Sequence, residues 1–183
     1  MKPGQSLFLC LSSAFLCLTL GCTKEDTQKE LSPLPLTLTE YIDADWEKQI
    51  LDTPGIPAET RHIKYTGEKT WIEVFARGED VLCVRRKIYY RPDIFGPTDL
   101  KVQTIIMLIL EKTTKLEVAD FSPAFHRWMG QAVHDAVNGN KIDTGFDEKG
   151  FAVRLRTHGD DLILECARSI TMQAFKPVAI HSQ

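Results

Sequence analysis

The sequence predicts an α+β fold: a single domain in which a twisted antiparallel sheet of about five to six strands has two main helices packed on it. Several segments alternate apolar and polar residues and are joined by turns of two or three residues, and turns this short connect antiparallel neighbours. Two other segments place apolar residues at helical spacing. The 183 residues are 43% apolar and 26% charged, which is ordinary for one folded domain and argues against a disordered chain or a multi-span membrane protein.

The first helix is expected over residues 37–52. Thr37 and Glu40 have the spacing of a capping box, in which each side chain accepts a backbone N–H of the other residue. Pro54-Gly55 would end the helix. Apolar side chains recur every four residues along it and predict one buried stripe, with Trp46 as a core anchor (Leu38, Ile42, Trp46 and Ile50).

Strand patterns follow from residue 61 to residue 112. Residues 62–65 form a weak strand signal, and residues 70–77 a stronger one that a turn at 78–80 joins to a long strand over 81–91. Residues 100–112 hold eight aliphatic or methionine side chains, several of them β-branched. We therefore expect a central strand there that is covered on both faces.

The second helix and two closing strands complete the expected order. Ser122 is the predicted N-cap, Pro123 occupies the first turn and Gly139 ends the helix. The residues that follow, up to position 148, are expected to form a polar loop. Strands are predicted over 150–157 and 161–171, joined by a turn at 158–160.

The N-terminus predicts export and membrane attachment. After a single basic residue, Lys2, residues 7–20 carry no charge; fourteen residues are too few to span a bilayer but suit the apolar region of a signal peptide. This run ends in Thr19-Leu20-Gly21-Cys22, which resembles the processing site of bacterial lipoproteins. The resemblance implies cleavage before Cys22, lipidation of its thiol with acyl chains that include palmitate, and, because Thr23 is not aspartate, retention at the periplasmic face of the outer membrane rather than at the inner membrane or the cell surface.

These features divide the chain into three parts. Residues 1–21 are the expected signal peptide, residues 22–36 the lipidated cysteine and a flexible tether, and residues 37–183 the globular α+β domain. The net charge of −3 argues against a nucleic-acid partner, because nucleic-acid-binding domains usually carry a basic excess. The expected partners are the membrane, through the anchor, and a protein or another envelope component.

No motif of catalytic chemistry stands out. The sequence contains neither G-x-S-x-G nor S-x-x-K, its five histidines and its cysteines do not cluster at metal-ligand spacing, and it lacks a glycine-rich phosphate loop. We therefore expect no catalytic residues, no metal and no cofactor, although acids far apart in the sequence can meet in a fold.

Two segments are candidate partner-binding sites. Arg85, Arg86, Lys87 and Tyr89 form a basic, aromatic strand, on which residues 85, 87 and 89 face one way and residue 86 the other. This strand could hold an anionic lipid head group, a lipopolysaccharide phosphate or an acidic protein, or it could be an ordinary solvent-facing strand. Ile94 and Phe95 lie in the following proline-bounded loop, where they could meet a partner or fold over the core.

The last two cysteines leave one question open. Cys83 and Cys166 each lie within an apolar strand, where they could pair as a disulfide in an oxidising compartment or remain buried thiols. The favoured function is a non-catalytic, membrane-anchored lipoprotein that binds a partner. The alternatives are a periplasmic hydrolase with a dispersed site and an immunity or inhibitor lipoprotein.

Overall fold

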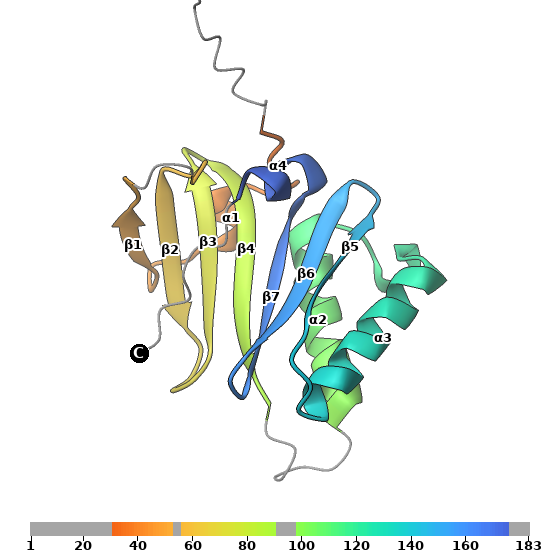
Figure 1. Cartoon of the computed structure of the whole chain (residues 1–183). Coiled ribbons are helices and arrows are strands. Elements are labelled where there is room, and N and C mark those ends of the chain that lie inside the picture. The colour runs from red at the N-terminus through yellow and green to blue at the C-terminus, as the bar shows by residue number, and fades with distance from the viewer. Residues whose placement is uncertain (1–30, 53–55, 91–97, 176–183) are drawn as a thin grey trace, which may run out of the picture.

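The structure, a computed structural model, describes residues 31–52, 56–90 and 98–175. It contains one antiparallel sheet of seven strands together with four α-helices, so the predicted α+β class and the antiparallel sheet are confirmed. The expected number of five to six strands was too low. The strand order across the sheet is β1-β2-β3-β4-β7-β6-β5 (Figure 1).

The helices and strands have the following bounds. The strands are β1 (Glu47–Ile50), β2 (Thr60–Tyr65), β3 (Trp71–Arg77), β4 (Asp80–Tyr89), β5 (Asp143–Glu148), β6 (Phe151–His158) and β7 (Asp161–Arg168). The helices are α1 (Leu38–Tyr41), α2 (Thr98–Thr114), α3 (Pro123–Val137) and α4 (Ser169–Ala174), with one 3₁₀ turn, η1 (Val118–Asp120).

The two long helices cover one face of the sheet. α2 and α3 pack on each other; α2 passes behind the sheet and contacts β7, and α3 lies beside β5 (Figure 1). The main core lies between them and the sheet, with fully buried side chains from both layers, among them Ile106, Leu110 and Phe125 from the helices and Val84 and Leu155 from the strands. At roughly 25 cal/mol per Å² of apolar surface, burial of this layer is the main term that stabilises the fold.

The second helix and the central hairpin were predicted correctly. The Ser122 hydroxyl accepts the backbone N–H of Phe125 at 3.1 Å, Pro123 occupies the first turn, and Gly139 follows the helix with φ +83°. β3 and β4 are joined at Gly78, whose φ of +57° suits a residue without a side chain.

The helix expected over residues 37–52 is wrong beyond its first turn. The capping box of Thr37 and Glu40 forms, but α1 ends at Tyr41, and Ile42 already has extended backbone. The Asp43 carboxylate accepts the Asp45 N–H and pairs with Lys64 of β2, which fixes a turn. The chain then returns as β1 along β2, and Ile50, expected in the buried stripe, is 82% exposed.

The central strand expected over residues 100–112 is also wrong, because this segment is helix α2. Its buried side chains recur at helical spacing, at Val102, Ile106, Ile109 and Leu110, whereas Leu108 faces solvent. The segment is therefore a helix that covers the sheet and not a strand within it.

A strand, β5, replaces the polar loop expected before residue 148. Its side chains alternate between exposed and half-buried, and its half-buried Thr144 and Phe146 contact α3. The Trp128 indole N–H donates to the Thr144 hydroxyl at 3.0 Å, and the Phe146 ring packs against Phe125 and Trp128. Residues 169–171, expected to continue the last strand, belong instead to α4.

The packed domain begins before residue 37. Leu34 and Leu36, placed in the tether by the sequence analysis, are buried in the main core, and the Leu34 N–H donates to the Val81 carbonyl at 2.8 Å. Ser32 exchanges two hydrogen bonds with Thr171. Residues 32–36 therefore act as part of the fold in the described chain.

Candidate functional site

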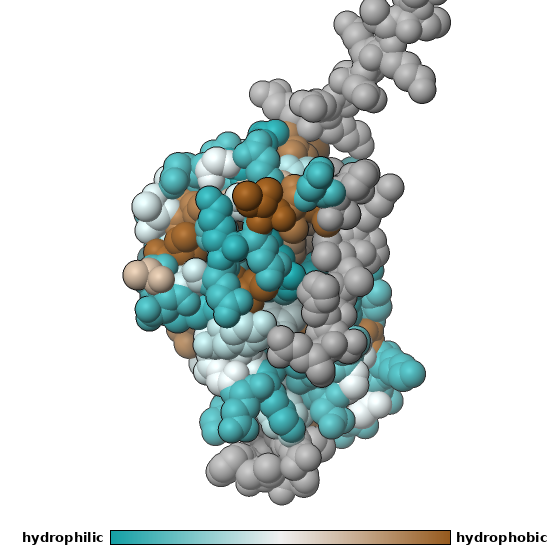
Figure 2. Space-filling view, turned by 90° about the vertical axis from the view of Figure 1, so that its left-hand side faces the viewer, coloured by the Kyte–Doolittle hydropathy of each residue, from teal (hydrophilic) through white to brown (hydrophobic). Residues whose placement is uncertain are grey.

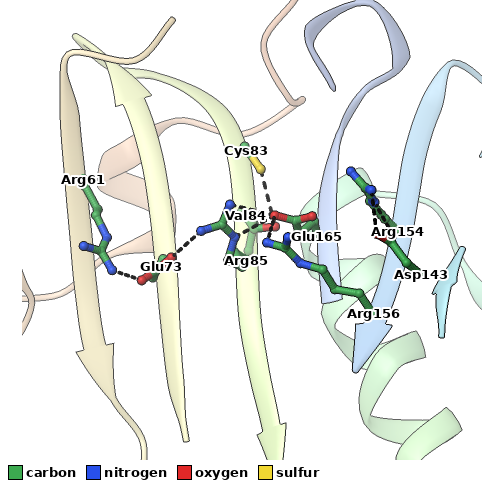
Figure 3. Close-up of polar contacts among 9 residues, drawn as sticks. All are labelled: Arg61, Glu73, Cys83, Val84, Arg85, Asp143, Arg154, Arg156 and Glu165. Atoms are coloured by element: carbon green, nitrogen blue, oxygen red, sulfur yellow. Dashed lines mark hydrogen bonds and ion pairs between the residues drawn. The ribbon is translucent and has the colours of Figure 1, made fainter. Parts of the chain in front are cut away.

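The candidate site is the face of the sheet opposite α2 and α3, called here the open face. One end of this face is closed by α4 and by an apolar cluster that includes Phe75, Cys83 and Ala167, with Met172 and Phe175 packed against it. Charged side chains cross the middle of the face (Figure 3), and a hollow lies at the other end.

The charged side chains form an alternating row across five neighbouring strands, called here the charge ladder. Its members, in spatial order, are Arg61 of β2, Glu73 of β3, Arg85 of β4, Glu165 of β7 and Arg156 of β6. Antiparallel register places Arg85 directly between Glu73 and Glu165, so all three side chains point to the same face.

Arg85 is the centre of the ladder. It is 2% exposed; its Nε and Nη2 each lie 2.7 Å from Oε1 of Glu165, and its Nη1 lies 3.3 Å from Oε2 of Glu73 (Figure 3). Burial is the largest single influence and acts to lower the pKa of the Arg85 guanidinium, but the groups around it, Glu165 first among them, together outweigh burial, and the pKa is raised. Arg85 therefore stays positively charged and compensates the buried negative charges of Glu73 and Glu165.

The ladder ends in an arginine on each side and carries three cations against two anions. Arg61 donates to Glu73 and, from Nη1, to the Gln49 side-chain oxygen at 3.3 Å; Arg156 donates to Glu165 at 3.1 Å. The Nε groups of Arg61 and Arg156 are buried and have no acceptor among the described residues. An unpaired buried donor costs about 1–3 kcal/mol, so both ends of the ladder are sites where an added acceptor oxygen would be stabilising.

The hollow has a volume of about 750 Å³. Its aromatic side chains are Tyr65, Trp71 and Tyr89, from the adjacent ends of β2, β3 and β4. Its charged and polar lining residues are Gln49, Arg61, Glu68, Lys69, Glu73, Lys87, His158, Asp160 and Asp161. This volume lies within the range of small-ligand sites, although the lining is more polar than in most of them.

Two cations of the hollow are held by neighbours. Lys87 Nζ lies 2.9 Å from Asp161 Oδ2, and Lys69 Nζ lies 5.0 Å from the centre of the Tyr89 ring. Of the basic residues expected on the β4 strand, Lys87 is therefore paired here and Arg85 is paired within the ladder.

The predicted partner-binding residues of β4 separate into three environments. Lys87 and Tyr89 line the hollow. Arg85 is buried in the ladder and is not a surface contact. Arg86 lies on the other face of the sheet, in a small groove of about 220 Å³ beside α2 that Ile105 also lines.

The possible disulfide between Cys83 and Cys166 does not form in the structure. Both are free thiols. Cys83 pairs in register with Ala167 and Cys166 with Val84, so the two side chains point to opposite faces of the sheet. Burial raises the pKa of both thiols, that of Cys166 to about 12, which also makes them poor nucleophiles at neutral pH.

The other predicted site residues, Cys22, Ile94 and Phe95, lie outside the described residues. Within the described part of the chain, no three His, Cys, Asp or Glu side chains are grouped so that they could hold a metal ion. A helix long and apolar enough to cross a membrane is likewise not found among residues 31–52, 56–90 and 98–175.

Comparisons with protein-family models, with curated proteins and with solved structures find no match to this chain.

Sequence reasoning missed most residues of this face. Arg61, Glu73, Glu165 and Trp71 each occupy an alternate position of a strand pattern, but only the strand order brings them together. The one available signal was a charged residue at an otherwise apolar strand position, as in Glu165 between Leu164 and Cys166.

Proposed function

We propose that this chain is a lipid-anchored envelope protein that binds a partner through the open face of its sheet. The anchor is Cys22, and the described domain presents the hollow beside Tyr89 and Trp71. The single observation that supports a binding role best is this hollow, which combines three aromatic side chains with both signs of charge.

A partner could instead add a strand of its own to the edge strand β1, but the surface there makes this a weaker alternative. β1 has four residues, all of them exposed, and two of them, Glu47 and Lys48, are charged. The molecule seen from this side is mainly hydrophilic, with smaller apolar patches (Figure 2). A short, charged edge strand is how natural sheets discourage pairing with another chain.

A hydrolase with a dispersed site is the second candidate. His158, Asp160 and Asp161 lie together at one end of the hollow, which is the kind of grouping that such an enzyme needs. Asp161 is, however, paired with Lys87, and Glu73 is held by two arginines. Because these two carboxylates are committed to ion pairs, binding is the better-supported role.

Fractionation tests the anchor. Wild-type protein should sediment with membranes and be released by detergent, whereas Cys22→Ala should lose this association. A Cys83→Ala variant is the matched control, since Cys83 is buried in the sheet and should not affect fractionation beyond its effect on stability. Continued tight membrane association of Cys22→Ala would contradict the proposal.

A further inference from the structure

We propose that the hollow on the open face binds a sugar that carries a carboxylate, with Arg61 as the carboxylate-binding residue and Trp71 as the stacking surface. This inference rests on the proposed binding function and names the chemical class of its ligand. Three independent features of the hollow support it.

The first feature is the state of Arg61. This side chain lines the hollow, yet it is only 7% exposed, and its Nε has no acceptor among the described residues. The Nη groups already bind Glu73 and Gln49. Because Arg61 lines the hollow, we assign a ligand oxygen there as the acceptor for Nε, and a carboxylate forms the stronger, charge-assisted bond with a guanidinium.

The second feature is the aromatic lining. Trp71 is half-buried and Tyr65 is 47% exposed; Tyr65 lies on the same strand as Arg61, and Trp71 pairs with Tyr65 from the neighbouring strand β3. The faces of aromatic rings carry negative charge density and attract the weakly positive C–H groups of a sugar ring. A ligand held by Arg61 would extend over these rings.

The third feature is the balance of charge around the hollow. Glu68 and Asp160 are exposed acidic lining residues, whereas the carboxylates of Asp161 and Glu73 are already held in ion pairs. A polyanion such as a phosphate-rich polymer would be repelled by these acids. Sugar hydroxyls donate hydrogen bonds to carboxylates, so a ligand with one acid group and several hydroxyls fits the lining.

A peptide is the less suitable occupant. The hollow lies on the face of the sheet, where the strands have already paired their backbone groups with each other. A bound peptide would lack the main-chain hydrogen bonds that provide most of its affinity when it adds to a sheet edge.

The test is a titration of the membrane-extracted protein in detergent micelles with matched pairs of sugars. In each pair, the first sugar carries a carboxylate group and the second does not: glucuronate and glucose, galacturonate and galactose, N-acetylmuramate and N-acetylglucosamine. The reporter is the NMR signal of the Trp71 indole N–H, identified by its loss in Trp71→Phe. The indoles of Trp46 and Trp128 pack on the helix side of the sheet and serve as internal references.

We expect at least one acidic sugar to shift the Trp71 signal saturably by about 10 mM, while its neutral partner binds at least about tenfold more weakly. Arg61→Gln should lower the affinity for the acidic sugar at least about tenfold. Arg154→Gln, on the same face but paired with Asp143 outside the hollow, should leave binding unchanged. If Arg61→Gln fails to fold, Trp71→Leu replaces it. Because this variant lacks the reporter indole, its binding is followed by isothermal titration calorimetry and should be lost for both members of a pair.

Equal binding of the acidic and neutral sugars would overturn the role of Arg61. Absence of any saturable shift, or tighter binding of an acidic dipeptide such as Glu-Ala, would overturn the ligand class. If a partner can then still be crosslinked to the open face in envelopes, only the ligand class has failed. If no partner is crosslinked there either, the result also counts against the proposed function.

Discussion

Replacing Arg85 by methionine should destabilise the protein strongly. The substitution keeps an unbranched side chain of similar length but removes the cation that lies between Glu73 and Glu165, all three being at most 5% exposed. Breaking a buried ion pair from one side costs about 3–5 kcal/mol, because the remaining charge stays buried without its partner. Each glutamate keeps one arginine, Arg61 or Arg156, so we expect the lower end of this range, about 3 kcal/mol.

The assay is urea unfolding followed by circular dichroism, with the free energy of unfolding obtained by linear extrapolation. A loss of about 3 kcal/mol is a large fraction of the roughly 5–15 kcal/mol typical of a folded domain. Arg154→Met is the control, since Arg154 pairs with Asp143 at the surface and such a pair contributes about 0–1 kcal/mol. Equal stability of Arg85→Met and Arg154→Met would refute the claim that the ladder is a coupled, buried network.

Three further predictions follow from single contacts. Ser122→Ala should lower the free energy of unfolding by about 1 kcal/mol, because the hydroxyl caps α3 at the Phe125 N–H. Burial lowers the pKa of His62 below its ordinary 6.5, so the unfolded chain binds more protons; wild-type stability should therefore fall more than that of His62→Gln between about pH 7.5 and about pH 5.5. Cys83 and Cys166 should resist iodoacetamide in the native protein and react after denaturation, as measured by peptide mass spectrometry.

Each of these predictions has a clear contrary result. Ser122→Thr retains a capping hydroxyl, and a loss equal to that of Ser122→Ala would argue against the cap. Parallel pH profiles for wild type and His62→Gln would show that His62 titrates alike in both states. A peptide pair joined through Cys83 and Cys166 would contradict their placement on opposite faces of the sheet.

Local signals predicted those elements whose ends are marked in the sequence. Ser122, Pro123 and Gly139 fix both ends of α3, and the glycine turn at residue 78 fixes the β3–β4 hairpin. A comparable signal for β5 was present but weak: Lys149-Gly150 both have positive φ, as in the tight turns that join two strands. Its single large apolar residue, Phe146, made the strand hard to distinguish from a polar loop.

The two wrong assignments have a common physical origin. Residues 105–110 are apolar at every position, so the run satisfies the pattern of a buried strand and that of a buried helix equally well. Residues 38–50 carry apolar side chains every four positions, yet the chain turns after α1, and Asp43 in this turn binds Lys64, a residue twenty-one positions away. The periodicity of a local segment carries no information about a partner so distant in the sequence.

The open face was beyond prediction for a related reason. Strand alternation correctly placed Arg85, Lys87 and Tyr89 on one side of β4. Whether that side is free, paired or buried depends on β3 and β7, and β7 reaches β4 only after the chain has formed both long helices. The charges of Glu73 and Glu165, which neutralise Arg85, thus come from pairings that only the topology specifies.

Site-specific photocrosslinking in intact envelopes tests the central claim most directly. A benzophenone side chain placed at Tyr89, in the hollow, should yield crosslinked products when the full-length protein is expressed and irradiated. The same group at Leu108, exposed on α2 at the helix-covered side, is the control and should yield none. Products from Leu108 but not from Tyr89 would contradict the claim that the open face of the sheet is the binding surface.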